Sequence, residues 1–238
     1  MTRIFTPGSE LPFAGHPTIG AAFALAASGR LPIVDDAAEV VLDEPAGPVP
    51  VSIECRGGRP VRCRLTAPQR PSPAGMPDPA TLAAAASLGP DDVHPDLACA
   101  TWSAGVPFPV LPVRDLDALA RARPAGSADH PELYLATPLG EPARATEWRV
   151  RMFAPGLCIP EDPATGAAAA AFAGYLAALD AERTSVRTWI LHQGVEMGRP
   201  SLLEVTVHRD RAGGEVARVE VGGAAVVVGS GRIDATLP

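Results

Sequence analysis

The sequence predicts an α+β protein made of two pseudo-symmetric halves, each a barrel-like, mostly antiparallel sheet around a central helix, with the first half incomplete. Three observations predict this class. They are a repeated motif, an apolar helical run after each copy of the motif, and strand-like segments with glycine turns after each run. The 238 residues suit two modest domains. We therefore expect a first half at residues 1–97 and a second half at residues 98–238.

The repeat lies at the start of each half. Arg3-Ile4-Phe5-Thr6-Pro7-Gly8 recurs 148 positions later as Arg151-Met152-Phe153-Ala154-Pro155-Gly156. After a two-residue deletion the similarity resumes, so that His16-Pro17 corresponds to Asp162-Pro163. The same local structure is therefore expected in both halves.

A run of small apolar residues follows each copy, at residues 18–28 and 164–179. Both runs are apolar around most of a helix circumference, which predicts two buried central helices. Pro17 and Pro163 are expected at the first helical position, where the missing N–H costs nothing. This places His16 and Asp162 beside the two helix caps.

The remaining elements follow from strand-like alternation and glycine turns. Strands are predicted at residues 39–42, 49–55, 60–65, 106–113, 132–136, 185–192, 201–208, 215–221 and 224–228, with turns at Gly57-Gly58, Gly213-Gly214 and Gly222-Gly223. Short helices are predicted at residues 79–88 and 116–122, and the chain is expected to cross between halves near residues 89–98. A strand-helix-strand unit precedes only the second copy of the repeat. The sequence therefore predicts that the first half lacks this unit and that the chain is truncated at its N-terminus.

Composition excludes several classes of function. All 20 basic residues are arginine, so no lysine can form a Schiff base or a phosphate-binding loop. The net charge of -7 argues against a nucleic-acid partner. No apolar run is long enough to span a membrane, and no secretory signal is present, which favours a cytoplasmic protein. The four cysteines and five histidines are scattered, so neither a disulfide framework nor a metal site is expected.

The two helix starts predict an anion site. Free backbone N–H groups with the helix dipole behind them attract a negative charge, and two related halves would present two such starts to one cleft. A small carboxylate is the natural ligand. His16 from one half and Asp162 from the other suit proton transfer, and no cofactor motif is present. The alternatives are an ordinary N-cap for Asp162 and a partly buried structural imidazole for His16.

Three segments together resemble the phenazine-biosynthesis PhzF-like family of isomerases. They are RIFTPGSELPFAGHP at residues 3–17, EDPATG at 161–166 and QGVEMGRPS at 193–201. The resemblance covers almost the whole chain. It implies a fold similar to diaminopimelate epimerase, with the active site in the cleft between the halves. It also implies a cofactor-independent isomerase that moves a proton on a small carboxylic acid, and it makes a homodimer a candidate assembly.

The resemblance also implies roles for individual residues. His16 and Asp162 match the family's active-site histidine and aspartate. The turns expected to hold the substrate carboxylate match Gly15, Thr165, Gly166 and Ala167. The family commonly has serine where this chain has Ala167, so one hydrogen bond of about 1 kcal/mol would be lost.

One departure from the family pattern weakens the expectation of activity. The main acid/base residue of the family is a glutamate in a segment ahead of the first motif, and this sequence has no such segment. Neither Glu10 nor Glu161 is favoured as a substitute. The alternative function is a non-catalytic remnant or small-anion-binding module of the same fold. A thiol-based epimerase that uses Cys158 is a third, less favoured hypothesis.

Overall fold

The computed structural model of the chain describes residues 2–6, 9–125 and 132–231. Its helices are α1 (Gly15–Ala27), α2 (Pro79–Ala85), α3 (Leu116–Arg121) and α4 (Gly166–Leu179), with 3₁₀ turns η1 (Pro90–Asp92) and η2 (Pro155–Leu157). The strands are β1 (Ile4–Phe5), β2 (Glu10–Leu11), β3 (Ala37–Glu44), β4 (Gly47–Arg56), β5 (Arg59–Thr66), β6 (Ser72–Gly75), β7 (Ala100–Ser103), β8 (Pro107–Pro112), β9 (Leu133–Pro138), β10 (Glu147–Ala154), β11 (Ile159–Asp162), β12 (Val186–Gln193), β13 (Ser201–Arg209) and β14 (Val216–Gly223).

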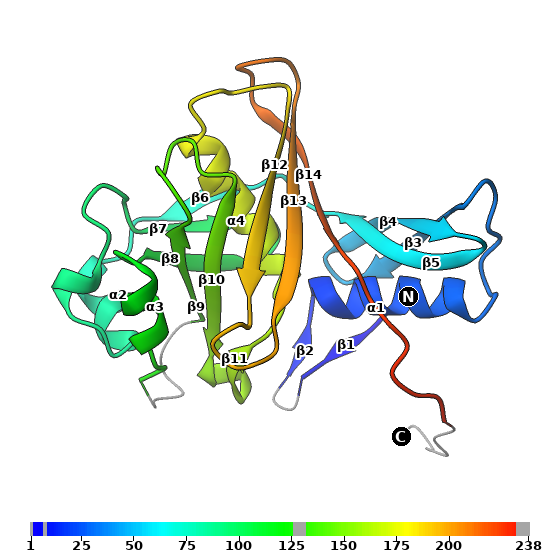
Figure 1. Cartoon of the computed structure of the whole chain (residues 1–238), viewed down its shortest axis with the longest axis horizontal. Helices are drawn as coiled ribbons and strands as arrows, with labels where there is room; N and C mark the ends of the chain where they lie inside the picture. The colour runs from blue at the N-terminus through cyan, green and yellow to red at the C-terminus, as the bar shows by residue number, and fades with distance from the viewer. Residues whose placement is uncertain (1, 7–8, 126–131, 232–238) are drawn as a thin grey trace.

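One continuous sheet joins the two halves (Figure 1). Its strand order is β3-β4-β5-β14-β13-β12-β10-β9-β8-β7-β6, with β11 paired to β10. Most neighbours are antiparallel, and the pairs β10–β12 and β8–β9 are parallel. The predicted α+β class, with helices set against a mostly antiparallel sheet, is confirmed.

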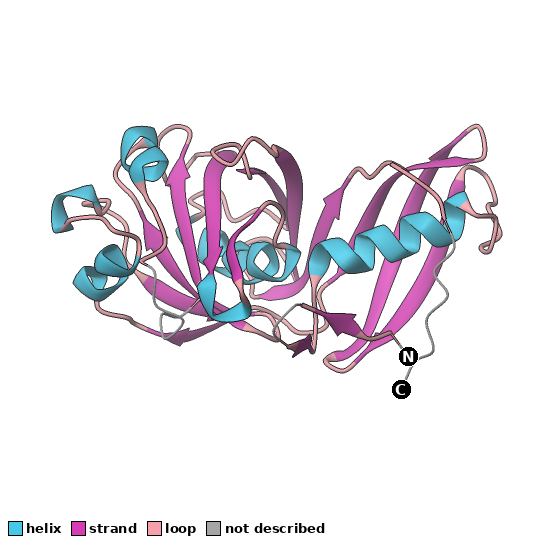
Figure 2. Ribbon diagram, turned by 90° about the horizontal axis from the view of Figure 1, so that it is seen from below, coloured by secondary structure: helices cyan, strands magenta, loops and turns pink. Residues whose placement is uncertain are grey.

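The second half encloses α4. Strands from both ends of its part of the sheet, β6 to β8 on one side and β13 and β14 on the other, contact this helix (Figure 2). Its alanine-rich sequence gives it a narrow surface, so the sheet closes round it, and Ala168 to Ala173 are fully buried. Phe172 anchors the packing, because its ring lies 5.4 Å from the rings of both Tyr134 and Trp148. The predicted buried central helix is confirmed here.

Helix α1 of the first half is covered on one side. It lies along the inner face of β3, β4 and β5, where alternate residues of β4 such as Val51 and Ile53 are buried (Figure 2). Ala22 and Phe23 face this sheet, but Ala24 and Ala27 are exposed. The prediction of a buried central helix therefore holds only for the flank of α1 that faces this three-stranded sheet, and the opposite flank is exposed.

The two copies of the repeat form corresponding elements. β1 pairs antiparallel with β2 ahead of α1, and the end of β10 pairs antiparallel with β11 ahead of α4. Arg3 forms a two-bond ion pair with Glu10, and Arg151 forms one with Glu161. The first pair is exposed, whereas Arg151 is buried and also donates to two carbonyl groups at the end of α3. Pro7 and Gly8 of the first copy lie outside the described residues.

Strand β14 connects the halves. Its observed extent shows that the turn predicted at Gly222-Gly223 and the strand predicted after it are both wrong. The strand pairs with β13 on one edge, and its last residues, from Glu220 to Gly223, pair with β5 on the other. Gly222 and Gly223 continue this strand rather than form a hairpin turn, since Gly222 pairs with residues of both β13 and β5 and Gly223 pairs with Cys63 of β5. The strand predicted at residues 224–228 is wrong as well, because β14 ends at Gly223 and the segment that follows it forms no strand.

The division at residue 97 stays a prediction, and the structure adds detail to it. β6, inside the proline-rich segment, pairs with β7. α2 shares a small core with α3, β8 and β9 through Leu82, Leu119 and Leu135. Residues 72–85 therefore lie beside the second half. Among the described residues, no helix is long and apolar enough to cross a membrane.

Two glycine substitutions test how tightly α4 is enclosed. In Gly174→Ala the new methyl group would lie 2.7 Å from Pro71 and would overlap Trp102, so we expect a loss of about 1–3 kcal/mol in the free energy of unfolding. Gly20→Ala, in α1, has open space around it and should add about 0.5–1 kcal/mol. Urea unfolding followed by circular dichroism measures both. Equal stability of Gly174→Ala and the unmodified protein would contradict this packing.

Candidate active site

The starts of α1 and α4 meet between the two halves. Gly15 and Gly166 are the first helical residues, and their backbones are in direct contact. A methyl group built on Gly166 would lie 2.6 Å from Cα of Gly15, and one on Gly15 would overlap Gly166. Only glycine fits at these two positions, so the contact fixes where the helix starts lie relative to each other.

Both helices begin at other residues than predicted. α1 starts at Gly15, ahead of Pro17, and α4 starts at Gly166, after Pro163. The prediction that the prolines occupy the first helical position is therefore wrong, because the glycine contact sets the starts. Neither helix has a side-chain hydrogen bond at its N-cap residue, Ala14 or Thr165. Their first-turn N–H groups remain free to bind an anion.

His16 links the halves from the first turn of α1. Its Nδ1 lies 2.7 Å from the carbonyl oxygen of Ala164, in the turn before α4. A carbonyl oxygen can only accept, so Nδ1 donates and carries a hydrogen. In the neutral ring Nε2 is then the basic nitrogen. The side chain is exposed, which leaves Nε2 accessible.

Asp162, at the end of β11, is held in a hydrogen-bond network. Thr165 Oγ1 donates to Asp162 Oδ2 at 2.5 Å. Gln193, fully buried at the end of β12, donates from Nε2 to the carbonyl oxygen of Asp162 at 2.8 Å and to Thr165 Oγ1 at 2.9 Å. Its Oε1 accepts from the backbone N–H of Thr165 at 3.2 Å. Gln193 therefore fixes both residues of the turn that leads into α4.

A second buried contact holds the start of α1. The Thr18 hydroxyl donates to the carbonyl oxygen of Ala14 at 2.6 Å and also contacts the carboxyl group of Glu44, at the end of β3. One hydroxyl hydrogen cannot serve both acceptors. Burial raises the pKa of Glu44, and in its neutral form this carboxyl group can donate to Thr18 instead.

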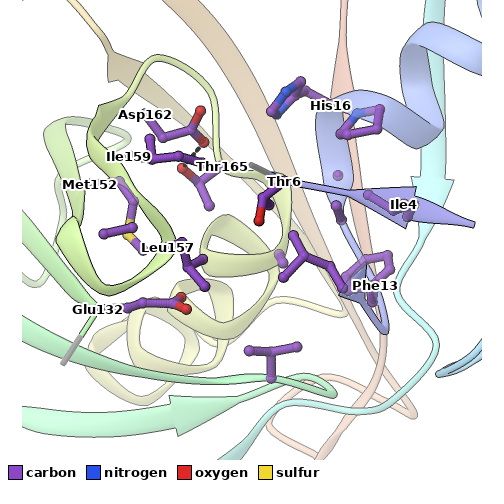
Figure 3. Close-up of a pocket in the computed structure, with 18 of the residues that line it drawn as sticks. Ile4, Thr6, Phe13, His16, Glu132, Met152, Leu157, Ile159, Asp162 and Thr165 are labelled. Atoms are coloured by element: carbon purple, nitrogen blue, oxygen red, sulfur yellow. Dashed lines mark hydrogen bonds between the residues drawn. The ribbon is translucent and has the colours of Figure 1, made fainter. Parts of the chain in front are cut away.

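A cavity of about 230 Å³ lies beside the glycine contact (Figure 3). Its apolar walls come from Ile4, Phe13, Val106, Phe108, Met152, Leu157 and Ile159. Its polar side chains include Thr6, His16, Glu132, Asp162 and Thr165. The six residues that the sequence predicts for the site all line this one cavity: Gly15, His16, Asp162, Thr165, Gly166 and Ala167.

Two residues of the site were missed by sequence reasoning. Glu132, just before β9, extends into the cavity, and burial raises the pKa of its carboxyl group (Figure 3). The only sequence signal for it was a single acidic residue at the start of a buried strand. Gln193 lies in the motif at residues 193–201. Its role was not predicted, because its hydrogen bonds are made to Asp162 and Thr165 in the distant turn before α4.

The other side chains considered from the sequence lie elsewhere. Glu10 and Glu161 are both engaged in ion pairs with arginine and do not line the cavity. Cys158 is exposed at the turn between η2 and β11 and does not line the cavity either. Within residues 2–6, 9–125 and 132–231, no group of three His, Cys, Asp or Glu side chains could hold a metal ion.

Thiol labelling at pH 8 tests this placement of the cysteines. Burial raises the pKa of Cys63 and of Cys99 to about 11 and also raises that of Cys55, so few of these buried thiols ionise at pH 8. We expect one fast-reacting thiol in the folded protein, that of Cys158, and all four after denaturation. Cys158→Ala should abolish the fast phase. A second fast thiol would contradict the burial of the other three.

Comparison with known proteins agrees with this architecture. The model of the phenazine biosynthesis-like protein family, PhzC-PhzF, matches residues 1–231. The chain is 37% identical to an uncharacterized isomerase of Mesorhizobium japonicum, over 97% of this chain and 78% of that protein. It is 34% identical to a trans-2,3-dihydro-3-hydroxyanthranilate isomerase of Pseudomonas aeruginosa, over 97% and 77% of the two chains.

A solved structure gives the same result. A predicted epimerase of Pseudomonas aeruginosa superposes with a TM-score of 0.73 and 31% identity, covering 96% of this chain and 79% of that one. The family model covers nearly the whole chain, and the relatives carry the names of isomerases and epimerases. The chain is therefore an isomerase that belongs to the phenazine biosynthesis-like PhzC-PhzF family.

Proposed function

We propose that this protein isomerises a small cyclic carboxylic acid by proton transfer, without a cofactor, in the cavity between the two halves. The observation that carries the proposal is the meeting of two uncapped helix starts beside a cavity that holds His16 and Asp162, one from each half. A carboxylate needs an anion site, and proton transfer needs ionisable groups within reach. This cavity offers both.

The substrate carboxylate would bind at the helix starts. The N–H groups of Gly15 and His16 on one side, and of Gly166 and Ala167 on the other, belong to the first turns of two helices whose dipoles favour a negative charge. Ala167 lines the cavity but has no hydroxyl group, so the carboxylate would depend on backbone donors at this position.

The reacting carbon would lie near His16 and Asp162. His16 Nε2 is free to accept a proton because Nδ1 is engaged with Ala164. Asp162 is oriented by Thr165 and Gln193, which lowers the cost of holding it in a reactive position. A proton removed from one carbon and returned to another changes the position of a double bond or a stereocentre without any net redox change.

The relatives suggest the substrate class. Several are trans-2,3-dihydro-3-hydroxyanthranilate isomerases, with 32–34% identity to this chain. The compound in that name is a small unsaturated ring with a carboxylate. An apolar cavity of about 230 Å³ with an anion site at one end suits such a ring. We infer a substrate of this class.

Solvent deuterium incorporation tests the proposal. Incubated in D₂O with trans-2,3-dihydro-3-hydroxyanthranilate and related cyclic acids, after treatment with EDTA, the protein should give product deuterated at carbon. Asp162→Asn and His16→Gln should each lower the rate about 100-fold or more, because each removes a proton-transfer group. His94→Gln and Asp117→Asn lie outside the cavity and serve as matched controls. Binding of these acids without any exchange would support the anion-binding module instead.

Gln193→Leu tests the network behind Asp162. It removes the donors to Asp162 and Thr165 and leaves the Thr165 N–H without its partner, so we expect about 1–3 kcal/mol lower stability. Below the unfolding temperature, kcat should fall more than KM rises, because Asp162 loses its orientation while the anion site remains. Gln69→Leu, at an exposed position, is the control. Unchanged kcat in Gln193→Leu would remove Gln193 from the site.

A further inference from the structure

The carboxyl group of Glu132 differs from the other carboxyl groups around the site. Asp162 accepts from Thr165, Glu161 is paired with Arg151, and Glu10 is paired with Arg3. Glu132 has no hydrogen-bond or ion-pair partner among the residues that the structure describes. This carboxyl group therefore loses part of its hydration without gaining a described protein partner, which leaves it available to a ligand in the cavity.

Strand alternation aims Glu132 at the cavity. Tyr134, two residues later in β9, packs its ring against Phe172 of α4 and lies opposite Met152 of β10. Side chains two residues apart in an extended chain point to the same face of a sheet. Glu132 therefore points towards the same side as α4, and Figure 3 shows its carboxyl oxygens directed into the cavity.

The same register relates Glu132 to Asp162. Met152 lies opposite Tyr134 on one side and opposite Asp162 on the other, so the three neighbouring strands β9, β10 and β11 direct a row of side chains to one face. Glu132 and Asp162 lie along one wall of the cavity, and His16 lies across from Glu132 (Figure 3). A ring held in the cavity would have ionisable groups on more than one side.

The surroundings of Glu132 suit an acid/base group. Leu157, Ile159 and Ala154 line the cavity with it, and burial raises the pKa of its carboxyl group. The ionisable groups that line the same cavity within the described residues are His16 of α1 and Asp162 of β11. A carboxyl group with a raised pKa is a stronger base when ionised and remains partly protonated nearer neutral pH, so it can both accept and donate a proton.

We propose that Glu132 is a further catalytic residue that exchanges a proton with the substrate ring on the side away from His16. This inference rests on the proposed function. The Glu132 carboxylate accepts a proton from a ring carbon, so that a C–H bond breaks and an O–H bond forms. The electron pair moves into the adjoining unsaturated system, and the protonated Glu132 carboxyl group, after exchange with solvent, gives a proton to a second ring carbon. An O–H bond breaks and a C–H bond forms, so the carboxylate is regenerated and the substrate leaves isomerised with no oxidant or reductant involved.

The first experiment is kinetic. Glu132→Gln should lower deuterium incorporation about 100-fold or more, because the amide cannot accept the proton. Glu132→Asp should recover part of the rate. The acidic limb of the kcat/KM pH profile, set by a carboxyl group that must be ionised, should disappear or move in Glu132→Gln. Glu39→Gln, an exposed change on β3, is the matched control. A full rate with an unchanged profile in folded Glu132→Gln would overturn the proposal.

The second experiment separates failure of this inference from failure of the proposed function. Carbon-13 NMR of glutamate-labelled protein, assigned with Glu132→Gln, follows the Glu132 carboxyl titration with and without benzoate. A carboxylate bound within the cavity should raise this pKa further, because like charges disfavour ionisation. If the unmodified protein catalyses no exchange but this shift occurs, the proposed reaction fails and the placement of Glu132 beside the ligand stands. If benzoate binds and the titration does not move, the inference on Glu132 fails whatever the activity.

Discussion

The contact between Gly15 and Gly166 is the constraint on which the site depends. Two helices from different halves bring their starts to one point only if neither carries a side chain there, and each glycine is within contact of the other's backbone. The contact brings the first-turn N–H groups of α1 and α4 close together. The cavity lies beside this contact and is lined by both glycines. A larger residue at either position would push the halves apart and separate His16 from Asp162, which come from opposite sides of this contact.

The two copies of the repeat build this site unequally. In the second copy the Arg151–Glu161 pair is buried under the end of α3, α4 is enclosed on all sides, and Asp162 is fixed by the buried Gln193. In the first copy the Arg3–Glu10 pair is exposed, and α1 is covered on one flank. One half therefore contributes a half-buried carboxylate that accepts from Thr165 and whose backbone carbonyl accepts from Gln193, and the other contributes an exposed imidazole whose orientation is set by a single bond to the opposite half. Precise positioning is concentrated in the second half.

Local sequence patterns predicted the helices and strands whose formation depends mainly on neighbouring residues. The repeat identified both central helices and pointed to His16 and Asp162, whereas the other four predicted cavity residues came from the family resemblance. Strand-like alternation located β3, β4, β5, β8, β9, β12, β13 and β14. It did not predict the short strands β1, β2, β6, β7 and β11, nor the longer strand β10. It also ended β14 too early, because Gly222-Gly223 is an ordinary turn signal unless two strands flank it. The helix starts shifted because a tertiary contact, rather than proline, decided them. Glu132 stayed hidden because it reaches the cavity only through the pairing of β9 with β10, and no spacing rule connects it with residue 162.

The positions of the acidic groups follow from the electrostatics of the helix starts. A carboxyl group next to two helix N-termini is stabilised in its ionised form by their dipoles, and it competes with a carboxylate substrate for the same N–H groups. A further acid/base group can lie on an apolar wall, where burial favours the neutral form and no helix start competes for its charge. Glu132 occupies such a wall, beside Leu157 and Ile159, while the backbone of Gly166 and Ala167 forms the polar end. In the reaction that we propose, the cavity thus separates a place for the permanent charge of the substrate from a place for proton transfer.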